Sequence, residues 1–227
     1  MSKAFDLKKP NRPVHVGVIL PNAVNEVLDV APIDALYGMS KEGMKVFPDE
    51  LMPQHLRAHA FDIEFHWVSE TGKAPARLSS GINLIPTDSY GSCPPLDIVL
   101  IGAQHNYEKY SEADLAFIRK SFDDCSAFIS ICGGILAPMQ AGLLQGKSAT
   151  GPRVLLPMVR QTNPGVDWQE KRWVRDGKLW TSGTLLNGLD LMNAFCQETW
   201  GGEGTLWDFI SKAGSWPARD VDYKDGP

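Results

Sequence analysis

The chain has 227 residues, and its formal net charge of -5 provides no basic surplus to neutralise phosphates, which argues against a nucleic-acid-binding protein. Hydrophobic residues make up 43% of the chain, enough for a sizeable core, but no apolar run approaches the ~18–20 residues of a membrane helix. The first ten residues lack the apolar stretch of a signal peptide. We therefore expect a cytoplasmic protein that has no membrane or nucleic-acid partner.

The N-terminal part of the chain predicts a strand followed by a short helix. Residues 1–13 are polar and contain two prolines, so we expect a leader that is poorly ordered or lies over the surface. Residues 14–20 form an apolar, β-rich run that is typical of a buried strand. A helix is predicted over 32–37, because proline suits its first turn and Gly38 its C-terminus. Asp29 then precedes this helix, either as its N-cap or at the end of the strand.

The middle of the chain continues the alternation of strands and helices. Residues 39–60 mix charge with proline and indicate an inserted loop or short helix. Residues 61–68 alternate apolar and polar side chains and predict a second strand, and 79–89 suggest a short hairpin. Another buried strand is expected over 96–102. Ser111 is then predicted to cap a helix with a clear apolar stripe.

The second half begins with an apolar run, 127–131, which ends at Cys132 and leads into a helix expected to reach about Leu144. The pair Asp176-Gly177 is a strong signal for a two-residue hairpin turn. The remaining elements expected are a turn and short strand at 146–152, a hairpin at 171–182, and helices at 189–199 and 204–212.

This order of elements predicts the class of fold. Strands that alternate with helices indicate an α/β protein with a mainly parallel sheet, built as a flavodoxin-like three-layer α/β/α sandwich. We expect a single domain over 14–213, preceded by the leader and followed by a polar C-terminal tail at 214–227.

The segment Ser130-Ile131-Cys132-Gly133-Gly134 has the pattern of a nucleophile elbow, a sharp turn between a strand and a helix. Such a turn holds the nucleophile at strained backbone angles and near a helix N-terminus, where a thiolate is favoured. The usual pattern has glycine two positions to either side of the nucleophile, and here only the later one is glycine. A buried structural cysteine before a glycine-rich turn remains the alternative.

In α/β folds, ligands bind at the carboxyl ends of the parallel strands. Three separate segments are expected to meet there, and they contribute Asp29, the pair Gly102-Ala103, and Cys132. A carboxylate, backbone N–H groups and a thiol would then line one cleft. This convergence favours a functional role for Cys132 over packing alone.

The other cysteines and the histidines give weaker signals. Cys93 lies in a loop and is the main rival for reactivity, whereas two further cysteines lie in helix-like, apolar surroundings that indicate packing. His105 follows the Gly102 loop and could reach the cleft, and Thr184 and Leu185 could line a pocket. No zinc-finger spacing is present, so no metal site or cofactor is expected. The remaining residues of these types are Cys125, Cys196, His15, His55, His59 and His66.

The chain resembles the ThiJ/PfpI family of the class I glutamine amidotransferase-like superfamily over about residues 14–200. The order and spacing of several matching segments carry the resemblance, which is specific for the family and much less so for a reaction. The segments lie at 28–34, 97–102, 130–134, 141–150 and 174–183.

Within this family, the Leu-Asp pair before the first helix and the later hairpin most resemble the isonitrile hydratase branch, whose enzymes add water to R–N≡C. The resemblance implies that the Cys132 thiolate attacks the terminal carbon to form a thioimidate. It also implies that Asp29 is the general acid/base and that the N–H groups of Gly102 and Gly133 stabilise negative charge. A homodimer that acts on a small molecule is implied as well.

Three departures from the family pattern matter. Gly133 stands where relatives often carry Thr or Ala, so a hydroxyl is missing. Thr150, a candidate substrate-binding residue, lies where many members have a histidine, which argues against a Cys/His dyad. The segment before the first helix is one residue shorter than in the hydratases, and an ungapped match places Leu28 at the carboxylate position and makes Glu26 the alternative acid.

Two other functions remain open on the sequence. One is a glyoxalase-type conversion of 2-oxoaldehydes to hydroxy acids, which needs a proton shuttle that the missing histidine would have supplied. The other is a non-enzymatic redox sensor whose Cys132 is oxidised to a sulfinate. A transcription-factor role is not expected, because no basic helix-turn-helix segment is present.

Overall fold

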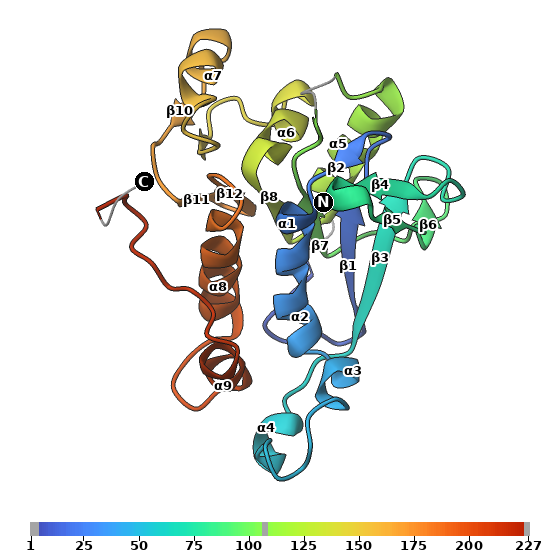
Figure 1. Cartoon of the computed structure of the whole chain (residues 1–227), viewed down its shortest axis with the longest axis vertical. Helices are drawn as coiled ribbons and strands as arrows, with labels where there is room; N and C mark the ends of the chain where they lie inside the picture. Colours follow the sequence, from blue (N-terminus) through green and yellow to red (C-terminus); the bar gives the residue numbers. More distant parts are fainter. Residues whose placement is uncertain (1–4, 106–108, 225–227) are drawn as a thin grey trace.

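A seven-stranded sheet forms the centre of the computed structural model, which describes residues 5–105 and 109–224 (Figure 1). All neighbouring strands are parallel except the pair β11–β12. In spatial order the strands are β11 (Trp173–Asp176), β12 (Leu179–Ser182), β8 (Ala127–Ser130), β7 (Ile98–Ile101), β1 (Val14–Ile19), β3 (Ile63–Ser69) and β6 (Asp88–Ser89).

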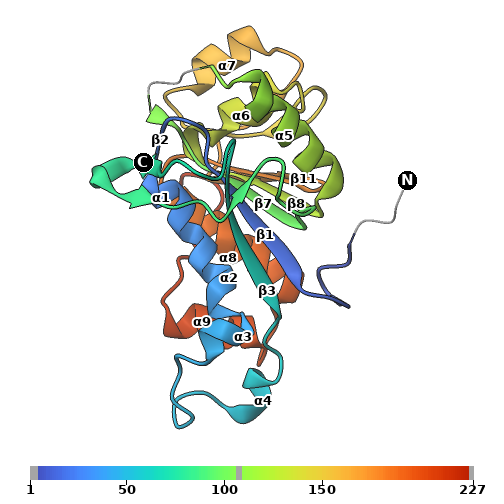
Figure 2. The same ribbon diagram turned by 90° about the vertical axis from the view of Figure 1, so that its right-hand side faces the viewer.

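Helices cover both faces of this sheet, and a separate apolar cluster fills each interface. Figure 2 shows α1, α2 and α8 on one face and α5, α6 and α7 on the other. Every residue of β7 and β8 is buried, because both strands are covered on both faces. The predicted three-layer α/β/α architecture is therefore confirmed. The helices are α1 (Val27–Val30), α2 (Asp34–Gly38), α3 (Lys41–Met44), α4 (Gln54–Arg57), α5 (Glu112–Asp124), α6 (Leu136–Gln140), α7 (Leu156–Thr162), α8 (Asn187–Trp200) and α9 (Leu206–Ala213).

The first helical segment begins earlier than predicted. α1, a 3-10 turn over Ala31–Ile33 and α2 follow one another without a break, so Pro32 lies inside the segment and not in its first turn. The N-cap is Glu26, whose Oε1 accepts a hydrogen bond from Leu28 N–H at 3.5 Å. The interpretation of Asp29 as an N-cap is therefore wrong, since this residue lies within α1.

Several shorter elements also differ from the prediction. The hairpin consists of β4 (Ala76–Leu78) and β5 (Asn83–Leu84), which with β2 (Val24–Asn25) form a small separate sheet. The helix after Cys132 is a 3-10 turn, Cys132–Ile135, continued by α6, and it ends at Gln140. The short strand predicted within 146–152 is β9 (Ser148–Ala149), whereas helix α7 and the strand that pairs with β9, β10 (Asp167–Trp168), were not expected from the sequence.

Both terminal segments pack against the domain. In the leader, Leu7 is buried and its carbonyl accepts a hydrogen bond from Trp200 Nε1 at 2.7 Å. In the C-terminal tail, the carbonyl groups of Asp220 and Asp222 accept hydrogen bonds from Arg172 Nη1 at 2.7 and 2.8 Å. Each terminal segment is therefore held by side chains of the folded core.

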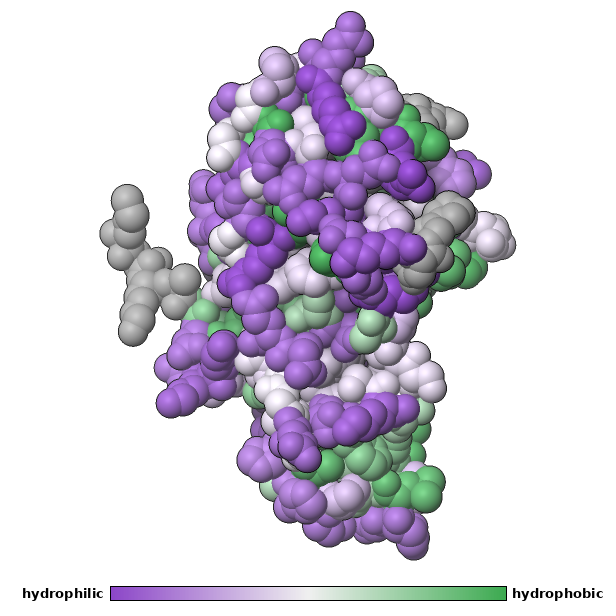
Figure 3. All heavy atoms as spheres, turned by 90° about the vertical axis from the view of Figure 1, so that its left-hand side faces the viewer, coloured by the Kyte–Doolittle hydropathy of each residue, from purple (hydrophilic) through white to green (hydrophobic). Residues whose placement is uncertain are grey.

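Figure 3 shows a largely hydrophilic face on the side of the C-terminal tail, with hydrophobic side chains gathered at the lower end of the molecule. That is the end at which α3 and α4 lie in Figure 1. Within the described residues, no helix combines the length and apolar character that crossing a membrane would require.

Candidate active site

Cys132 lies directly after the carboxyl end of β8, where the chain turns into a helical segment. Its φ angle is +58°, a left-handed conformation that is strained for a residue with a side chain. The turn is sharp because it packs on the neighbouring strand end. A Cβ atom on Gly134 would lie only 2.5 Å from the carbonyl oxygen of Ile101. The elbow therefore needs glycine at position 134, and it presents Cys132 at the carboxyl edge of the sheet.

Asp29 reaches the same edge from α1 and is completely buried. Its Oδ2 accepts a hydrogen bond from the N–H of Ala103 at 2.9 Å. Its Oδ1 is buried and has no hydrogen-bonding N or O partner within the described part of the chain. Gly102 allows this approach, since a Cβ atom there would lie 2.7 Å from the Cβ of Asp29. The loop after β7 thus positions the Asp29 carboxylate through a hydrogen bond to Oδ2 alone.

The Asp29 carboxylate and the Cys132 thiol lie close enough for each group to shift the pKa of the other. Burial raises the pKa of Asp29 to about 7, while the Ala103 N–H and the thiol act against this rise. Burial and the nearby charge of Asp29 raise the pKa of the Cys132 thiol to about 11. Near neutral pH, the pair therefore holds a protonated thiol beside a carboxyl group that is close to its midpoint.

The expectation of a resting thiolate at Cys132 is thus wrong. The N–H groups of Gly133 and Leu185 do favour the thiolate, but burial and the charge of Asp29 outweigh them. The thiol can still become a nucleophile, because a proton acceptor lies against it. Such a pair is activated by proton transfer at the moment of attack.

Glu26 forms a second layer around the pair, together with Ser79 and His105. Its Oε1 accepts a hydrogen bond from Ser79 Oγ at 2.8 Å, and its Oε2 lies 3.1 Å from His105 Nε2. Burial acts to raise the pKa of Glu26, but the hydrogen bonds from Ser79 and His105 outweigh burial. The pKa of Glu26 therefore lies below its ordinary value, and the carboxylate remains ionised. The charge of Glu26 raises the pKa of Asp29, and His105 lowers it. Of the two candidate carboxylates, Asp29 is the one that interacts with the thiol.

The remaining predicted site residues lie at different distances from this pair. Gly133 and Ala103 contribute N–H groups to the sulfur and to the carboxylate, respectively. Thr150 is fully buried, its N–H donates to Thr181 Oγ1 at 2.9 Å, and its hydroxyl donates to the carbonyl of Lys171 at 3.1 Å. Because both of these groups already serve the loop packing, the structure gives no support to a substrate-binding role for Thr150.

Leu185 adds a feature that its residue type did not signal. Its φ angle is +35°, and its backbone N–H interacts with the Cys132 sulfur. Leu185 also lines a cavity of about 660 Å³ beside the site. Thr184 and Leu185 both line this cavity, as predicted, whereas the N–H contact could not be predicted because it depends on the direction of the backbone. The cavity is lined by Arg153, Val154, Glu170, Thr184, Leu185, Leu186, Asn187, Arg219 and Tyr223.

The other cysteines lack such an environment. Burial raises the pKa of Cys93 to about 12 and that of Cys125 to about 12, and it raises the pKa of Cys196 well above its ordinary value. The Cys93 thiol donates a hydrogen bond to the neighbouring carbonyl of Pro94 at 3.4 Å. Among the four cysteines, Cys132 alone has a carboxylate against its sulfur in the described structure.

Comparison with known proteins identifies the family of the chain. Residues 50–198 match the model of the DJ-1/PfpI family, a range that contains Cys132 and Gly102 but not Asp29. An isonitrile hydratase from Pseudomonas putida is 33% identical over 166 residues, which cover 69% of this chain and 70% of the relative.

Solved structures show the same fold. A ThiJ/PfpI family protein from Pseudomonas syringae superimposes with a TM-score of 0.71 at 19% identity, covering 95% of this chain and 80% of that one. DJ-1beta from Drosophila melanogaster superimposes with a TM-score of 0.68 at 17% identity, covering 91% of this chain and 100% of that one. At these identities, the likeness concerns the fold alone.

Proposed function

Because this chain belongs to the DJ-1/PfpI family and sets a strained cysteine against a buried carboxylate, we propose that it is a cysteine-dependent hydratase that converts isonitriles to N-formamides. The observation that carries the proposal is the Cys132–Asp29 pair, in which burial raises the pKa of the carboxyl to about 7. A group with this pKa can both accept and return a proton near neutral pH. The similarity to an isonitrile hydratase supports the choice of substrate.

In the first half of the proposed reaction, the Asp29 carboxylate takes the thiol proton while the Cys132 sulfur attacks the terminal carbon of R–N≡C. The same carbon then receives the proton from Asp29, which gives the thioimidate R–N=CH–S–Cys132. One S–C and one C–H bond form, and no redox partner is needed. The unpartnered Oδ1 of Asp29 is the oxygen available for this transfer.

In the second half, Asp29 removes a proton from water while the water oxygen adds to the thioimidate carbon, and Asp29 passes this proton to the nitrogen, which gives R–NH–CH(OH)–S–Cys132. The hydroxyl proton of this adduct goes to the sulfur in the next step. Collapse of the tetrahedral adduct breaks the S–C bond and releases R–NH–CHO, and Cys132 recovers its proton. The N–H groups of Gly133 and Leu185 lie at the sulfur and stabilise its charge as the bond breaks. Substrate and water sum to the formamide.

The cavity beside Leu185 supports an apolar R group. Its wall includes the exposed apolar side chains of Val154, Leu185 and Leu186. These apolar side chains stand beside the charged side chains of Arg153, Glu170 and Arg219, and the cavity meets the site at Leu185, whose N–H interacts with the Cys132 sulfur. An isonitrile carries no charge, so the apolar part of this wall suits its R group. We propose that R extends toward this cavity while the terminal carbon faces Cys132.

The test is turnover of a small aliphatic isonitrile, followed by the appearance of the formamide. Cys132→Ala should abolish the activity while the far-UV circular dichroism stays unchanged. Cys93→Ala, which removes the rival thiol, should retain wild-type activity. Formamide production by Cys132→Ala at the wild-type rate would refute the proposal.

Two assays separate the alternatives. Formation of lactate from methylglyoxal would indicate the glyoxalase reaction, which needs a proton shuttle. His105 is exposed and interacts with Glu26, which argues against its use as that shuttle. Selective oxidation of Cys132 by mild peroxide, without turnover of either substrate, would indicate a redox sensor. Since the thiolate is the form that oxidises, a thiol pKa of about 11 disfavours that role.

We also propose that the protein is a cytoplasmic homodimer, as the family resemblance implies. Light scattering coupled to size-exclusion chromatography measures the mass in solution. A mass of about twice the chain supports the homodimer, and a mass equal to one chain refutes it.

A further inference from the structure

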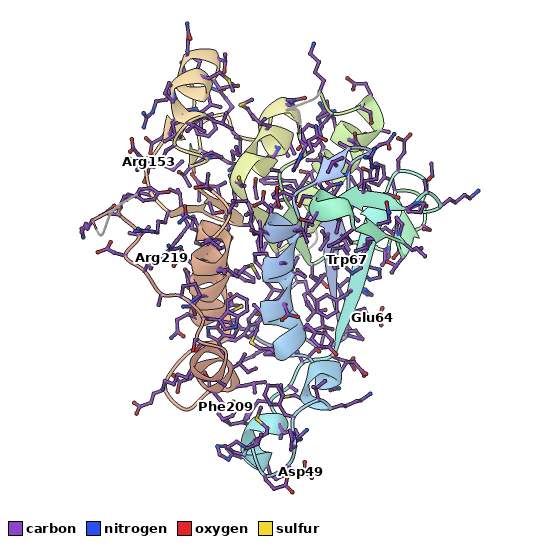
Figure 4. The ribbon with its side chains drawn as sticks, viewed as in Figure 1. Asp49, Glu64, Trp67, Arg153, Phe209 and Arg219 are labelled. Carbon is purple, nitrogen blue, oxygen red and sulfur yellow. The ribbon has the colours of Figure 1, made fainter. Side chains whose placement is uncertain are left out.

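A second cluster of ionisable side chains lies away from the Cys132 site. It consists of His15 on β1 with Glu64 and His66 on β3. These residues lie near the amino-terminal ends of two central strands, whereas Cys132 follows the carboxyl end of β8. Figure 4 labels Glu64 on β3, on the right-hand side of the molecule, opposite to α8. The proposed hydration reaction uses none of these three residues.

Strand register brings the three side chains to one face of the sheet. β1 and β3 are parallel, with His15 opposite Glu64 and Gly17 opposite His66. Residues two apart on a strand point to the same face, so Glu64 and His66 share the face of His15. Gly17 has no side chain to separate the two imidazole rings, whose centroids are 5.2 Å apart.

The donor atoms converge on one point. His15 Nδ1 lies 3.0 Å from His66 Nε2 and 3.5 Å from Glu64 Oε2, and all three atoms lie within 4.8 Å of one another. Two ligands of a tetrahedral zinc ion at 2.0–2.1 Å from the metal are about 3.3–3.4 Å apart. The observed spacings differ from this value by only a few tenths of an ångström for the two pairs that include His15. Two histidines and one carboxylate are also a recurrent donor set for divalent transition metals.

A further carboxylate orients His66 from behind. His66 Nδ1 lies 2.9 Å from Asp88 Oδ2, and the same oxygen accepts a hydrogen bond from Thr87 Oγ1 at 2.7 Å. When Nδ1 donates to a carboxylate, the lone pair of the neutral ring is on Nε2, the atom that faces His15. This carboxylate–histidine arrangement typically supports a metal-bound imidazole.

The site is also held in place and reachable. Asp97 fixes the backbone of His15, because its Oδ2 accepts from His15 N–H at 2.9 Å while Arg12 pairs with both of its oxygens. The side chains of His15 and His66 are 20% and 12% exposed, and that of Glu64 is 54% exposed. Glu64 can therefore swing toward the two nitrogens, and solvent can reach a fourth coordination position.

From this geometry we propose that His15, Glu64 and His66 bind a divalent transition-metal ion, with zinc as the representative ion and water in the fourth position. Asp88 is a positioning residue that acts through His66. The ion would join β1 to β3 and, through Asp88, to the two-residue edge strand β6. The site is therefore expected to stabilise this edge of the sheet, and it is separate from the Cys132 chemistry.

The test is a zinc titration of the metal-stripped full-length protein in competition with a chromogenic chelator. Wild type should bind one zinc ion per chain. His66→Ala should lose at least 100-fold in affinity, and Glu64→Gln, an exposed and fold-neutral change, should also bind more weakly. Asp88→Asn should weaken binding about 10- to 100-fold without removing a ligand. His55→Ala/His59→Ala, which alters the other pair of spaced histidines, should bind as wild type does.

A second readout identifies the ligands directly. Cobalt in this site should give the visible bands of a four-coordinate ion without a thiolate charge-transfer band. Zinc should raise the thermal midpoint of wild type more than that of Glu64→Gln. The proposal is overturned if Glu64→Gln and His66→Ala bind zinc like wild type. It is equally overturned if binding is lost in Cys132→Ser, or if wild type binds no zinc at concentrations below 1 mM, on the order of weak surface sites.

Discussion

At the scale of single residues, the proposed chemistry depends on one proton shared between the half-buried Cys132 thiol and the buried Asp29 carboxyl. The Cys132 thiol and the Asp29 carboxyl each have a raised pKa, and burial is the first cause for both. A protein that needed a permanent thiolate would place a cation at this position. A carboxylate instead suits a reaction in which the proton leaves the sulfur and returns to the substrate carbon.

The pH dependence of activity follows from this pair. The reactive form holds an ionised Asp29 and a protonated Cys132, so kcat/KM should rise as the pH increases through about 7 and decline as it approaches 11. Glu26→Gln removes a negative charge that raises the pKa of Asp29, and it should move the rising limb to lower pH. Rates for an uncharged isonitrile between about pH 5 and pH 11 give the profiles of wild type and Glu26→Gln, including the decline. Identical rising limbs for wild type and Glu26→Gln would contradict this assignment.

Asp29→Asn should stabilise the protein while removing its activity. The pKa of Asp29 is raised from 3.8 to about 7. The contribution of the Asp29 carboxyl to stability is therefore fully present below pH 3.8 and is lost as the pH rises through about 7. The difference between these two pKa values corresponds to about 4 kcal/mol of unfolding free energy at most. The gain in the free energy of unfolding of Asp29→Asn over wild type should therefore be larger at pH 8 than at pH 4.

Chemical denaturation at these two pH values measures the effect of Asp29→Asn. The matched control is Asp62→Asn, which changes an exposed aspartate and should show no comparable gain at pH 8. An equal effect of Asp29→Asn at both pH values would indicate that its carboxyl titrates normally in the folded protein.

Gly102→Ala tests the placement of the carboxylate. The new Cβ would lie 2.7 Å from the Cβ of Asp29, so the α1 segment or the loop after β7 must shift. We expect kcat to fall about 100-fold, the usual effect of a displacement of about 1 Å. The same shift should cost about 1–3 kcal/mol of stability. Steady-state kinetics and thermal unfolding measure both effects, with Gly91→Ala as the control, because its new Cβ would meet only Ser89 Oγ, at an ordinary contact distance of 3.8 Å.

At the scale of elements, the site is made where three segments end. The elbow after β8 supplies the thiol, the loop after β7 supplies the N–H that binds the carboxylate, and α1 supplies the carboxylate. Helix α5 lies on the opposite face, and its Ser111–Asp114 capping box satisfies its first turn. Changes in α5 should therefore affect stability without affecting the site.

Ser111→Ala tests this separation. The Ser111 Oγ accepts a hydrogen bond from Asp114 N–H at 3.0 Å, and its loss should cost about 1 kcal/mol of stability. The kcat/KM for an isonitrile should stay within about twofold of wild type, because α5 contributes no group to the pair. Lys120→Ala, an exposed change in the same helix, should cost less. A large loss of activity in Ser111→Ala would show that α5 is coupled to the elbow.

At the scale of the whole molecule, the C-terminal tail is part of the folded structure. Arg219 in the tail pairs with Asp190 on α8, whose side chain is 1% exposed, and Tyr223 donates a hydrogen bond to Asn187 Oδ1 at 2.9 Å. Arg219 and Tyr223 also form one wall of the cavity next to Leu185 (Figure 4 labels Arg219). The tail thus contributes both to stability and to the shape of the proposed substrate cavity.

Arg219→Ala should therefore destabilise the protein by roughly 2 kcal/mol, since it leaves the buried Asp190 charge without this partner. The estimate is below the full cost of breaking a buried pair, because 36% of the Arg219 side chain is exposed. Adding Asp190→Asn should restore part of the loss. Urea denaturation of the two single variants and the double variant gives the coupling free energy, and strictly additive effects would show that the two residues are not coupled.

Local periodicity and the small residues that a tight turn requires predict the main strands and helices, the three-layer class and the elbow at Cys132, but not α7 or β10. The sequence also placed Asp29, Gly102 and Cys132 at one edge, since parallel strands bring their carboxyl ends together. Tertiary packing, by contrast, brings Asp29 and not Glu26 to the thiol, because the start of α1 depends on a cap at Glu26 and on the space left by Gly102. Tertiary packing also decided the sign of the Cys132 pKa shift, since burial and a neighbouring charge outweigh the local effect of a helix N-terminus. Tertiary packing also brings together His15, Glu64 and His66, because the register of two strands that are distant in sequence places them side by side.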